Sequence, residues 1–528
     1  MLNHQAESPF AVELINVTKR FGNTIANHQI NLKIKRGSIH GIVGENGAGK
    51  STAMNMLYGF YTPDEGSIKI DNKDVFINSP AKALSLGIGM LHQHFLLSSE
   101  ESALDNILIG AEPVRPTFKI PKPFRWIRQF FKIDRSQALS TIENLLDSNS
   151  SHINLKDPVE KMSVGQQQRI EVLKVLYRSA EIIILDEPTA VLTPQETLQL
   201  FDQLRKLKGE GKTILIITHK LREVLNICDE VTVFRQGKVV ASRDSRKTTE
   251  SELAELMVGR VVDLHSRKIH PLKVSAQSVL IVENLSLQIA KVSKLKNLNL
   301  EIAEGEILGI AGVQGNGQTE LQNFLLNPSP FFQKKMATGN YKILGQDVGH
   351  LPTRELFKSG LASLADDRLR HGAIASLSIE ENFYLGLQNF PHFKNGIFSD
   401  KKNIRSALKK AKESFDIKYS QENSLFSSMS GGNQQKLVIA RELAKNPKVL
   451  IAAQPTRGVD IGAIEFIHQK LREYSANGMS VILISSELSE LFALSHRILV
   501  MYNGQLGASF NPERSSESDI GLAMGGAT

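Results

Sequence analysis

The stretch GENGAGKST (residues 44–52) combines three glycines with a lysine, a serine and a threonine. It follows the apolar run IHGIV and precedes an apolar run with helical spacing. Gly44, Gly49, Lys50 and Ser51 have the spacing of a phosphate-binding loop. Glycines let backbone N–H groups curl around phosphate oxygens, and the following helix adds its positive end. The stretch therefore predicts a strand, a phosphate-binding loop and a helix, the alternative being a glycine-rich turn with a coincidental lysine.

The bulk composition indicates a soluble protein with more than one core. The chain has 528 residues, of which 41% are hydrophobic and 22% charged, and domains rarely reach that length. Its net charge of +8 arises from 63 basic and 55 acidic residues. This excess is mild and does not by itself indicate nucleic acid. The single cysteine, Cys228, excludes an intramolecular disulfide and cysteine-rich zinc modules, and it fits a reducing compartment.

Membrane and export signals are not expected. No apolar run approaches the roughly 18 to 20 residues that span a bilayer. The N-terminal sequence MLNHQAESPFAVEL has neither the basic nor the apolar region of a signal peptide. A role at a membrane would therefore require another subunit to hold this chain there.

The chain is internally duplicated. Residues 13–52 resemble residues 281–320, and the glycines that open the two loops lie 268 positions apart. The related motifs MSVGQQQR and MSGGNQQK begin 267 positions apart. A duplication with so constant an offset predicts two domains of similar size. We place them at residues 10–260 and 279–526, joined by a polar linker at 261–278.

Each copy has the pattern of an α/β fold. Apolar runs such as AEIIILDE and KTILIITH alternate with helical patterns, which predicts a mostly parallel core sheet covered by helices. Shorter alternating runs before the first glycine loop predict an antiparallel β subdomain. Residues 100–160 are expected to form a separate, mostly helical subdomain.

Two carboxylates end the apolar run IIILDE. Asp186 and Glu187 would lie at the carboxyl edge of the sheet, where ligands of open α/β sheets bind. Asp186 could hold a magnesium ion, and Glu187 could polarise the attacking water. Carboxylates at strand ends are common on protein surfaces, so this tripeptide alone decides nothing.

The order of the motifs resembles the nucleotide-binding domain of the ABC ATPase superfamily. MSVGQQQR (residues 162–169) lies upstream of IIILDE, and IITHK (residues 216–220) follows it; MSVGQ corresponds to the superfamily's signature, with Val164 in place of its first glycine. The resemblance implies ATP and Mg²⁺ as cofactors. It implies that Gln93 senses magnesium and the membrane partner, that His219 contacts the γ-phosphate, and that Phe21 stacks on adenine. The implied catalytic residues are Glu187, His219 and Gln93, the metal ligands are Ser51, Gln93 and Asp186, and the loop that binds the nucleotide comprises Gly44, Glu45, Asn46, Gly47, Ala48, Gly49, Lys50, Ser51 and Thr52.

The second copy has lost the residues that this chemistry needs. Gln318 replaces the loop lysine, and Gln454 replaces the base with an amide that cannot accept a proton. An aspartate near position 366 stands where the superfamily has its glutamine. The remaining replacements are Ala453 for Asp186, Ser486 for His219 and Ile289 for Phe21.

The second copy nevertheless keeps its signature. MSGGNQQK (residues 429–436) contains Ser430, Gly431 and Gly432, and Asp460 resembles the superfamily's D-loop aspartate. In ABC ATPases each nucleotide lies between the phosphate-binding loop of one domain and the signature of the other. The resemblance therefore implies one hydrolytic site per chain, in which these four residues complete the site of the first copy.

Within the superfamily, the chain resembles the tandem ATP-binding subunits of bacterial simple-sugar and nucleoside importers. GIGMLHQHFLL, TAVLTPQE and AAQPTRGVDIGA resemble most the nucleoside branch, which is linked to basic membrane lipoproteins. This implies an ATPase that energises nucleoside uptake from the cytoplasmic face of the bacterial inner membrane. Its partners would be two integral-membrane permease subunits and a substrate-binding lipoprotein, with no nucleic acid. The alternatives are an ATPase of a ribose- or galactose-type importer and a soluble tandem ABC ATPase that acts on ribosomes or nucleic acid.

The segment PTFKIPKPFRWIRQFFKIDR (residues 116–135) is rich in cations and aromatic residues. Such a segment suits contact with membrane subunits or anionic lipid headgroups. The alternative is a solvated loop in which Trp126 covers a local cluster. Both interpretations remain open.

Overall fold

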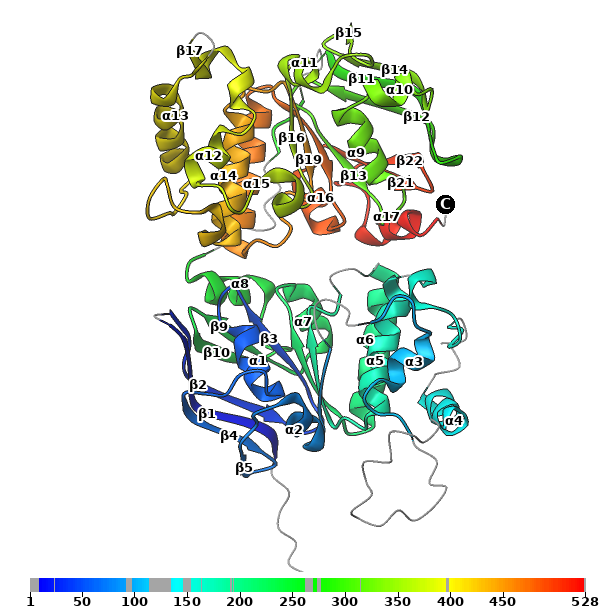
Figure 1. Cartoon of the computed structure of the whole chain (residues 1–528), viewed down its shortest axis with the longest axis vertical. Helices are drawn as coiled ribbons and strands as arrows, with labels where there is room; N and C mark the ends of the chain where they lie inside the picture. Colours follow the sequence, from blue (N-terminus) through cyan, green and yellow to red (C-terminus); the bar gives the residue numbers. More distant parts are fainter. Residues whose placement is uncertain are drawn as a thin grey trace, which may run out of the picture. The chain divides into compact units, whose positions relative to one another are not determined.

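The structure of the chain is a computed structural model. The chain divides into two compact units, Met1–Val261 and Val262–Thr528 (Figure 1). Among the described residues, no helix combines the length and the apolar character of a membrane span. The basic and aromatic segment 116–135 lies outside the described residues, apart from its last two. The structure describes residues 9–22, 24–91, 97–113, 134–145, 153–162, 164–189, 192, 194–261, 269–272, 277–313, 315–395 and 398–526.

The core of the first unit is a six-stranded sheet in the order β10-β9-β3-β8-β7-β6. Its strands are parallel except for β10, which pairs antiparallel with β9. The apolar runs that predicted the central strands β7 and β8 are buried along their whole length, as expected for strands covered on both faces. The strands are β3 (Ile39–Gly44), β6 (Ile88–Leu91), β7 (Ile182–Asp186), β8 (Thr213–Ile217), β9 (Glu230–Arg235) and β10 (Lys238–Asp244).

A second sheet in this unit is antiparallel and has the order β2-β1-β4-β5. Its long strand β2 alternates between buried and exposed residues near its C-terminal end, which fits a sheet with one face in the core. This confirms the antiparallel β subdomain that the alternating runs predicted. The strands are β1 (Phe10–Phe21), β2 (Thr24–Lys35), β4 (Glu65–Ile70) and β5 (Lys73–Val75).

The helices of the first unit fall into two groups. Helices α3, α4 and α5 share an apolar cluster of their own, separate from the cluster that joins α1 and the two sheets. The helices are α1 (Lys50–Tyr58), α2 (Pro80–Ser85), α3 (Ala103–Leu108), α4 (Arg135–Leu145), α5 (Val164–Tyr177), α6 (Pro194–Gly209), α7 (Leu221–Ile227) and α8 (Glu250–Val258), with a 3₁₀ turn η3 (Val159–Lys161).

The second unit repeats both sheets. Its core sheet has the order β16-β19-β20-β13-β21-β22, and its antiparallel sheet has the order β12-β11-β14-β15. Strand for strand, this is the order of the first unit. The strands are β11 (Ser278–Ile289), β12 (Val292–Ala303), β13 (Ile307–Ala311), β14 (Ala337–Ile343), β15 (Gln346–Asp347), β16 (Leu361–Leu364), β19 (Val449–Ala453), β20 (Ser480–Ile484), β21 (Arg497–Tyr502) and β22 (Gln505–Phe510), with a small hairpin of β17 (Lys394–Asn395) and β18 (Phe398–Ser399).

In the second unit, helices α12 to α15 lie on one side of the core sheet, away from the antiparallel sheet (Figure 1). The two units together confirm the predicted α/β fold. The helices are α9 (Gln318–Leu326), α10 (Ser329–Gln333), α11 (Thr353–Lys358), α12 (Ile379–Tyr384), α13 (Lys401–Ser414), α14 (Gly431–Leu443), α15 (Ile461–Ala476), α16 (Leu488–Leu494) and α17 (Glu517–Met524), with a π-helical turn η4 (Arg368–Gly372) and 3₁₀ turns η5 (Leu387–Asn389), η6 (Pro391–Phe393) and η7 (Phe426–Ser428).

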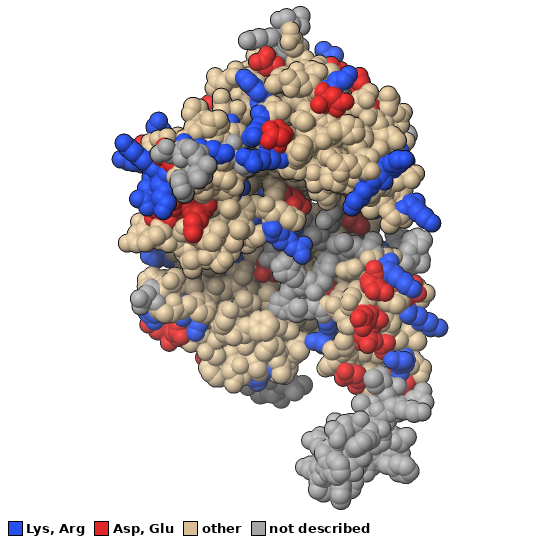
Figure 2. Space-filling view, turned by 45° about the horizontal axis from the view of Figure 1, so that its top comes forward, with Lys and Arg blue, Asp and Glu red and all other residues tan. Residues whose placement is uncertain are grey.

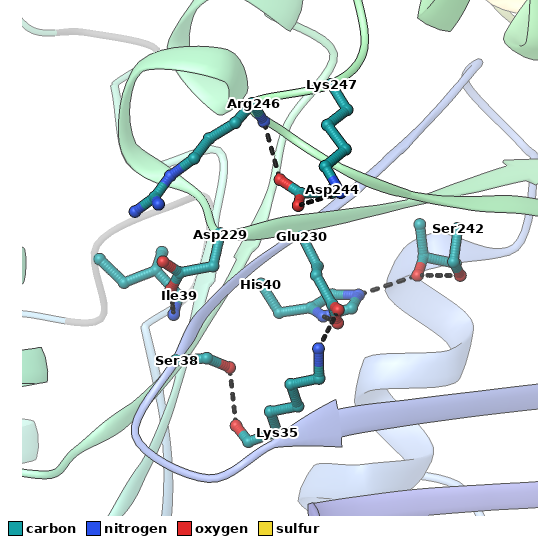
Figure 3. A network of polar contacts seen from close by, with 11 residues as sticks. Lys35, Ser38, Ile39, His40, Asp229, Glu230, Ser242, Asp244, Arg246 and Lys247 are labelled. Atoms are coloured by element: carbon teal, nitrogen blue, oxygen red, sulfur yellow. Dashed lines mark hydrogen bonds and ion pairs between the residues drawn. The ribbon is translucent and has the colours of Figure 1, made fainter.

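Polar contacts fix the start of β3, the strand that leads into the first glycine loop. Lys35 forms an ion pair with Glu230, and these two side chains and the ring of His40 point toward one another (Figure 3). The His40 ring is buried, and its Nε2 lies 2.8 Å from Thr232 Oγ1. Burial lowers the pKa of His40 from 6.5 to about 4, so this ring is neutral at physiological pH.

Charged side chains are mixed on the surface. Among the described residues on the face drawn in Figure 2, basic and acidic side chains are interspersed. This mixture fits the small excess of basic over acidic residues in the sequence.

Candidate nucleotide-binding site

The first glycine loop connects β3 to α1 in close contact with its neighbours. Gly49 has φ of 95°, and a Cβ atom there would lie 2.5 Å from the carbonyl oxygen of Ala26. A Cβ atom at Gly44 would lie 2.3 Å from the carbonyl oxygen of Phe234. Both positions require glycine, because the backbone of another strand occupies the space that a side chain would need. The loop is therefore a preformed cradle at the N-terminus of α1.

The lysine of the loop is held inside it. Lys50 Nζ donates hydrogen bonds to the carbonyl oxygens of Gly44 (2.7 Å) and Glu45 (2.9 Å). Burial lowers the pKa of Lys50, while Glu187 and Asp186 act in the opposite direction. A buried ammonium group among carbonyl oxygens lies ready to exchange these partners for phosphate oxygens.

Asp186 ends β7 beside the loop. Its carboxyl group forms a hydrogen bond with Ser51, and it is 9% exposed. Burial, together with the charge of Glu187, raises the pKa of Asp186 to about 6. A hydroxyl and a carboxylate in contact, at a position where negative charge is unfavourable without a counterion, fit a magnesium site. This observation tests the donor set that the sequence predicted, and the residues fit that ion.

Glu187 occupies a constrained backbone position next to Asp186. Its φ is 51°, and its N–H donates to the carbonyl oxygen of Ile217 at 2.9 Å. Its Oε1 lies 2.8 Å from His219 Nδ1. Its Oε2 is buried and has no hydrogen-bond partner among the described residues. A carboxylate held at one oxygen, with the other oxygen unsatisfied, is suited to polarise a water molecule.

Phe21 ends β1 at an exposed hairpin. Its ring is 43% exposed and meets Tyr61 edge to face, with 5.0 Å between the ring centroids. Phe21 pairs with Thr24 across the hairpin, two residues before Ala26, which contacts the glycine loop at Gly49. A half-exposed ring near the loop is available to stack on a base.

The structure thus brings together the glycine loop, Asp186, Glu187 and His219, with Phe21 on the adjoining sheet. Gln93 lies outside the described residues, so its predicted role remains a prediction. Asn46, Gly47 and Ser51 are exposed at the mouth of the loop. Ala48 and Thr52 are buried and partly buried, respectively.

One residue of this site was not predicted from the sequence. The buried side chain of Asn27 in β2 donates from Nδ2 to the carbonyl oxygen of Gly49 at 3.0 Å. It ties the antiparallel sheet to the loop at the residue that precedes α1. No motif spacing marks it, since its partner is a backbone atom 22 positions away.

The corresponding loop of the second unit has lost its cation. Gln318 Nε2 donates to the carbonyl oxygen of Val313 at 3.1 Å. Gln318 Oε1 is buried without a partner among the described residues. The amide closes onto its own loop as Lys50 does in the first unit, but it brings no charge for a phosphate.

The strand-end residues of the second unit keep the backbone and lose the chemistry. Gln454 has φ of 46°, and its N–H donates to the carbonyl oxygen of Ile484 at 2.8 Å. Its Nε2 donates to Ser486 Oγ at 3.1 Å. The Gln454 and Ser486 pair therefore occupies the positions of Glu187 and His219, with neutral groups in place of an acid and an imidazole. Ala453, at the end of β19, provides no ligand for a metal.

The retained signature of the second unit forms one surface with its D-loop. Ser430 caps α14, and its Oγ accepts hydrogen bonds from Asn433. Asp460 caps α15 by accepting from the N–H of Ala463 at 2.7 Å. A Cβ atom at Gly432 would lie 2.7 Å from Asp460 Oδ2. The four residues that the sequence singled out in this unit are therefore neighbours.

Comparisons with known proteins agree with this geometry. A family model described as "ABC transporter" matches residues 27–190 and 295–457. The chain is 41% identical to the guanosine import ATP-binding protein NupO of Bacillus subtilis, with 98% of each chain covered. It is 39% identical to the nucleoside import ATP-binding protein NupA of Lactococcus lactis, again with 98% of each covered. It is 34% identical to the ribose import ATP-binding protein RbsA of Clostridium tetani, with 97% of each covered. With this similarity over nearly its whole length, the chain belongs to the ABC transporter family and carries two of that family's nucleotide-binding ATPase domains in tandem.

Proposed function

We propose that this chain hydrolyses ATP at one site, in its first unit, to energise the import of a nucleoside. The observation that carries the single site is the contrast between two identical backbone positions. Glu187 faces His219 in the first unit, and Gln454 faces Ser486 in the second. Only the first pair can hold and position a water molecule for attack.

The residues of the first unit have distinct roles in this proposal. Bound Mg²⁺ and ATP supply the electrophilic γ-phosphate and neutralise its developing charge. Lys50 exchanges its two loop carbonyl partners for β- and γ-phosphate oxygens, and Ser51 and Asp186 hold the metal. Glu187 orients the attacking water through Oε2, while His219 fixes the carboxylate through Oε1. Phe21 stacks on adenine, and Gln93 reports the state of the metal to the membrane partner.

We infer that the second unit acts on the same ATP through its signature. Ser430, Gly431, Gly432 and Asp460 remain, although the hydrolytic residues of that unit are replaced. A signature without a hydrolytic site of its own is useful only if it completes another site. This role belongs to the two domains predicted at residues 10–260 and 279–526, joined by the linker 261–278.

The transported substrate and the partners follow from the relatives. Two of them, at 41% and 39% identity, are named for the import of guanosine and of nucleosides. A third, at 34%, is named for ribose import. We therefore favour a nucleoside, with a simple sugar as the second candidate. Two integral-membrane permease subunits and a substrate-binding lipoprotein would complete the importer, and this chain would work at the cytoplasmic face of the inner membrane.

The single-site proposal is tested by two substitutions in the complex purified with its membrane subunits. Glu187→Gln removes the base and should lower ATP turnover to the background level. Gln454→Glu restores only one of several lost groups and should leave turnover unchanged. Substantial turnover in Glu187→Gln, or an increase in Gln454→Glu, would contradict one hydrolytic site per chain.

The substrate is tested separately. In the complex with its binding protein, guanosine or another nucleoside should stimulate ATP turnover, and ribose should not. Stimulation by ribose alone would move the assignment to the sugar branch without affecting the hydrolytic site.

A further inference from the structure

In the second unit, Arg368 connects three elements that lie far apart in the sequence. It is the first residue of the π-helical turn η4, which follows β16. Its Nε donates to Gln434 Oε1 on the signature helix α14 at 3.2 Å. Its Nη1 and Nη2 donate to the carbonyl oxygens of Arg457 (3.0 Å) and Gly458 (3.3 Å). These two carbonyl groups belong to the turn that leads into Asp460.

The guanidinium group also explains why the signature begins with glycine. A Cβ atom at Gly431 would lie 2.7 Å from Arg368 Nη2 and 3.0 Å from the carbonyl oxygen of Gly458. Arg368 therefore lies directly against the first turn of α14. A side chain at Gly431 would push the guanidinium away from both of its backbone partners.

The sequence of the first unit lacks both parts of this arrangement. Strands β6 and β16 occupy the same place in their sheets and end at Leu91 and Leu364. The fourth residue after each strand is Phe95 in the first copy and Arg368 in the second. The signature position of Gly431 is taken by Val164 in the first copy. An arginine and a glycine thus occur together in the unit whose signature we propose to be active, and both are absent from the other.

We propose that Arg368 is a positioning residue that holds the signature and the D-loop turn of the second unit in the arrangement that ATP requires. This inference rests on the proposed role of that signature in the ATP site of the first unit. A guanidinium group offers donors in a fixed, planar fork, so three acceptors on two elements are held at once. A lysine at this position can satisfy one or two of them without fixing their relative orientation. Arg368 carries no chemistry itself and acts through Ser430, Gly431, Gly432 and Asp460.

The test compares Arg368→Lys and Arg368→Met with Arg370→Met. Arg370 is an exposed arginine on the same π-helical turn, so its substitution controls for loss of charge there. In the complex purified with its membrane subunits, we expect both Arg368 variants to lower kcat/KM for ATP by about tenfold or more, mainly through a higher KM. Arg370→Met should behave like the unchanged protein. Unchanged kcat and KM in both Arg368 variants would overturn the proposal.

Hydrogen exchange of the full chain separates positioning from loss of folding. In Arg368→Met, the amide groups of residues 432–435 and 458–461 should exchange faster, because the bridge between their elements is gone. The amides of β13 and β20 should keep their protection. Unchanged exchange at the signature and at the D-loop turn would overturn the proposal even if turnover fell.

A fourth variant separates this inference from the proposed function. Gly432→Asp places a carboxylate against Asp460 and should disable the signature. If Gly432→Asp is inactive while both Arg368 variants are normal, the positioning role is wrong and the role of the signature stands. If Gly432→Asp retains full turnover, the role of the signature is wrong, and hydrogen exchange alone decides whether Arg368 holds the two elements.

A double substitution tests the contact with Gly431 directly. Gly431→Ala should raise the KM for ATP, since its methyl group displaces the guanidinium. In the Arg368→Met background the same substitution should cost much less, so that the two effects are not additive. Additive effects would show that Gly431 and Arg368 act independently and would contradict the proposal.

Discussion

At the scale of single residues, the two units use one backbone for two kinds of chemistry. Glu187 and Gln454 both have positive φ values, 51° and 46°, and both donate from their N–H to the neighbouring strand. A non-glycine residue in this conformation costs free energy that the surrounding structure must offset. Retention of the strained position in the second unit indicates that its backbone still serves the fold. The loss of function there is a matter of side chains alone.

The buried ring of His40 leads to a prediction about acid stability. Its folded-state pKa is about 4, against 6.5 for an exposed histidine, because burial opposes protonation. Below pH 6.5 the unfolded chain binds a proton that the folded unit refuses until the pH approaches 4. This contribution to stability is therefore complete above pH 6.5 and decreases as the pH falls, by about 3 kcal/mol at most. Glu230, whose Oε2 lies 3.9 Å from His40 Nδ1, moderates the effect, and Lys35 adds to it.

The measurement is the urea midpoint of the first unit between pH 4 and pH 7. His40→Gln, which can still bond to Thr232, should flatten the dependence on pH below 6.5. His371→Gln is the matched control, because His371 is exposed, and it should leave the slope unchanged. Equal slopes for the unchanged protein and His40→Gln would show that this ring does not control acid stability.

At the scale of elements, the sequence predicted the parts whose signal is periodic or compositional. Buried strands such as β7 and β8 consist of β-branched and leucine residues, and the glycine loop follows from fixed spacing. The bonds of Asn27 and Arg368 could not be predicted, because their acceptors include backbone carbonyl groups far along the chain. A carbonyl acceptor leaves no trace in the identity of the residue that provides it. The same holds for the π-helical turn η4, whose sequence RLRHG has no distinctive pattern.

Two glycines of the first loop should respond differently to alanine. Gly47 has φ of 80°, and no atom lies within 4 Å of the place that a Cβ atom would take, so Gly47→Ala should cost only the conformational strain, roughly 1–2 kcal/mol. At Gly49 the same strain is joined by clashes at 2.5 Å with Ala26 and with the Asn27 amide. Gly49→Ala should therefore destabilise the first unit more and weaken ATP binding by about tenfold or more.

Binding of a fluorescent ATP analogue and the thermal midpoint of each variant provide the measurements. Asn27→Ala should reproduce part of the Gly49→Ala effect, since it removes the hydrogen bond to that residue. Equal losses in Gly47→Ala and Gly49→Ala would mean that the close contact with β2 is not what shapes the loop.

At the scale of the whole molecule, the duplication has been resolved into a division of labour. One unit keeps the residues that bind and hydrolyse a nucleotide, and the other keeps an intact signature next to its D-loop aspartate. Random decay would not spare the signature while replacing the loop lysine, both strand-end carboxylates and the histidine. The sequence alone revealed this asymmetry because each lost group is a change of residue type at a motif position.

The last prediction follows from the retained backbone of the second unit. Gln318→Lys, Ala453→Asp and Gln454→Glu together restore the cation, the metal ligand and the base on positions whose backbone geometry matches that of the first unit. In a Lys50→Ala background, which silences the first loop, this triple variant should gain magnesium-dependent ATP binding in the second unit. It should not gain turnover, because Ser486 still replaces the histidine and the signature of the first copy has Val164 for its first glycine. Equilibrium binding and phosphate release measure the two quantities separately. Recovered hydrolysis would mean that the first copy's signature is competent and that side chains of the second unit alone had silenced its site.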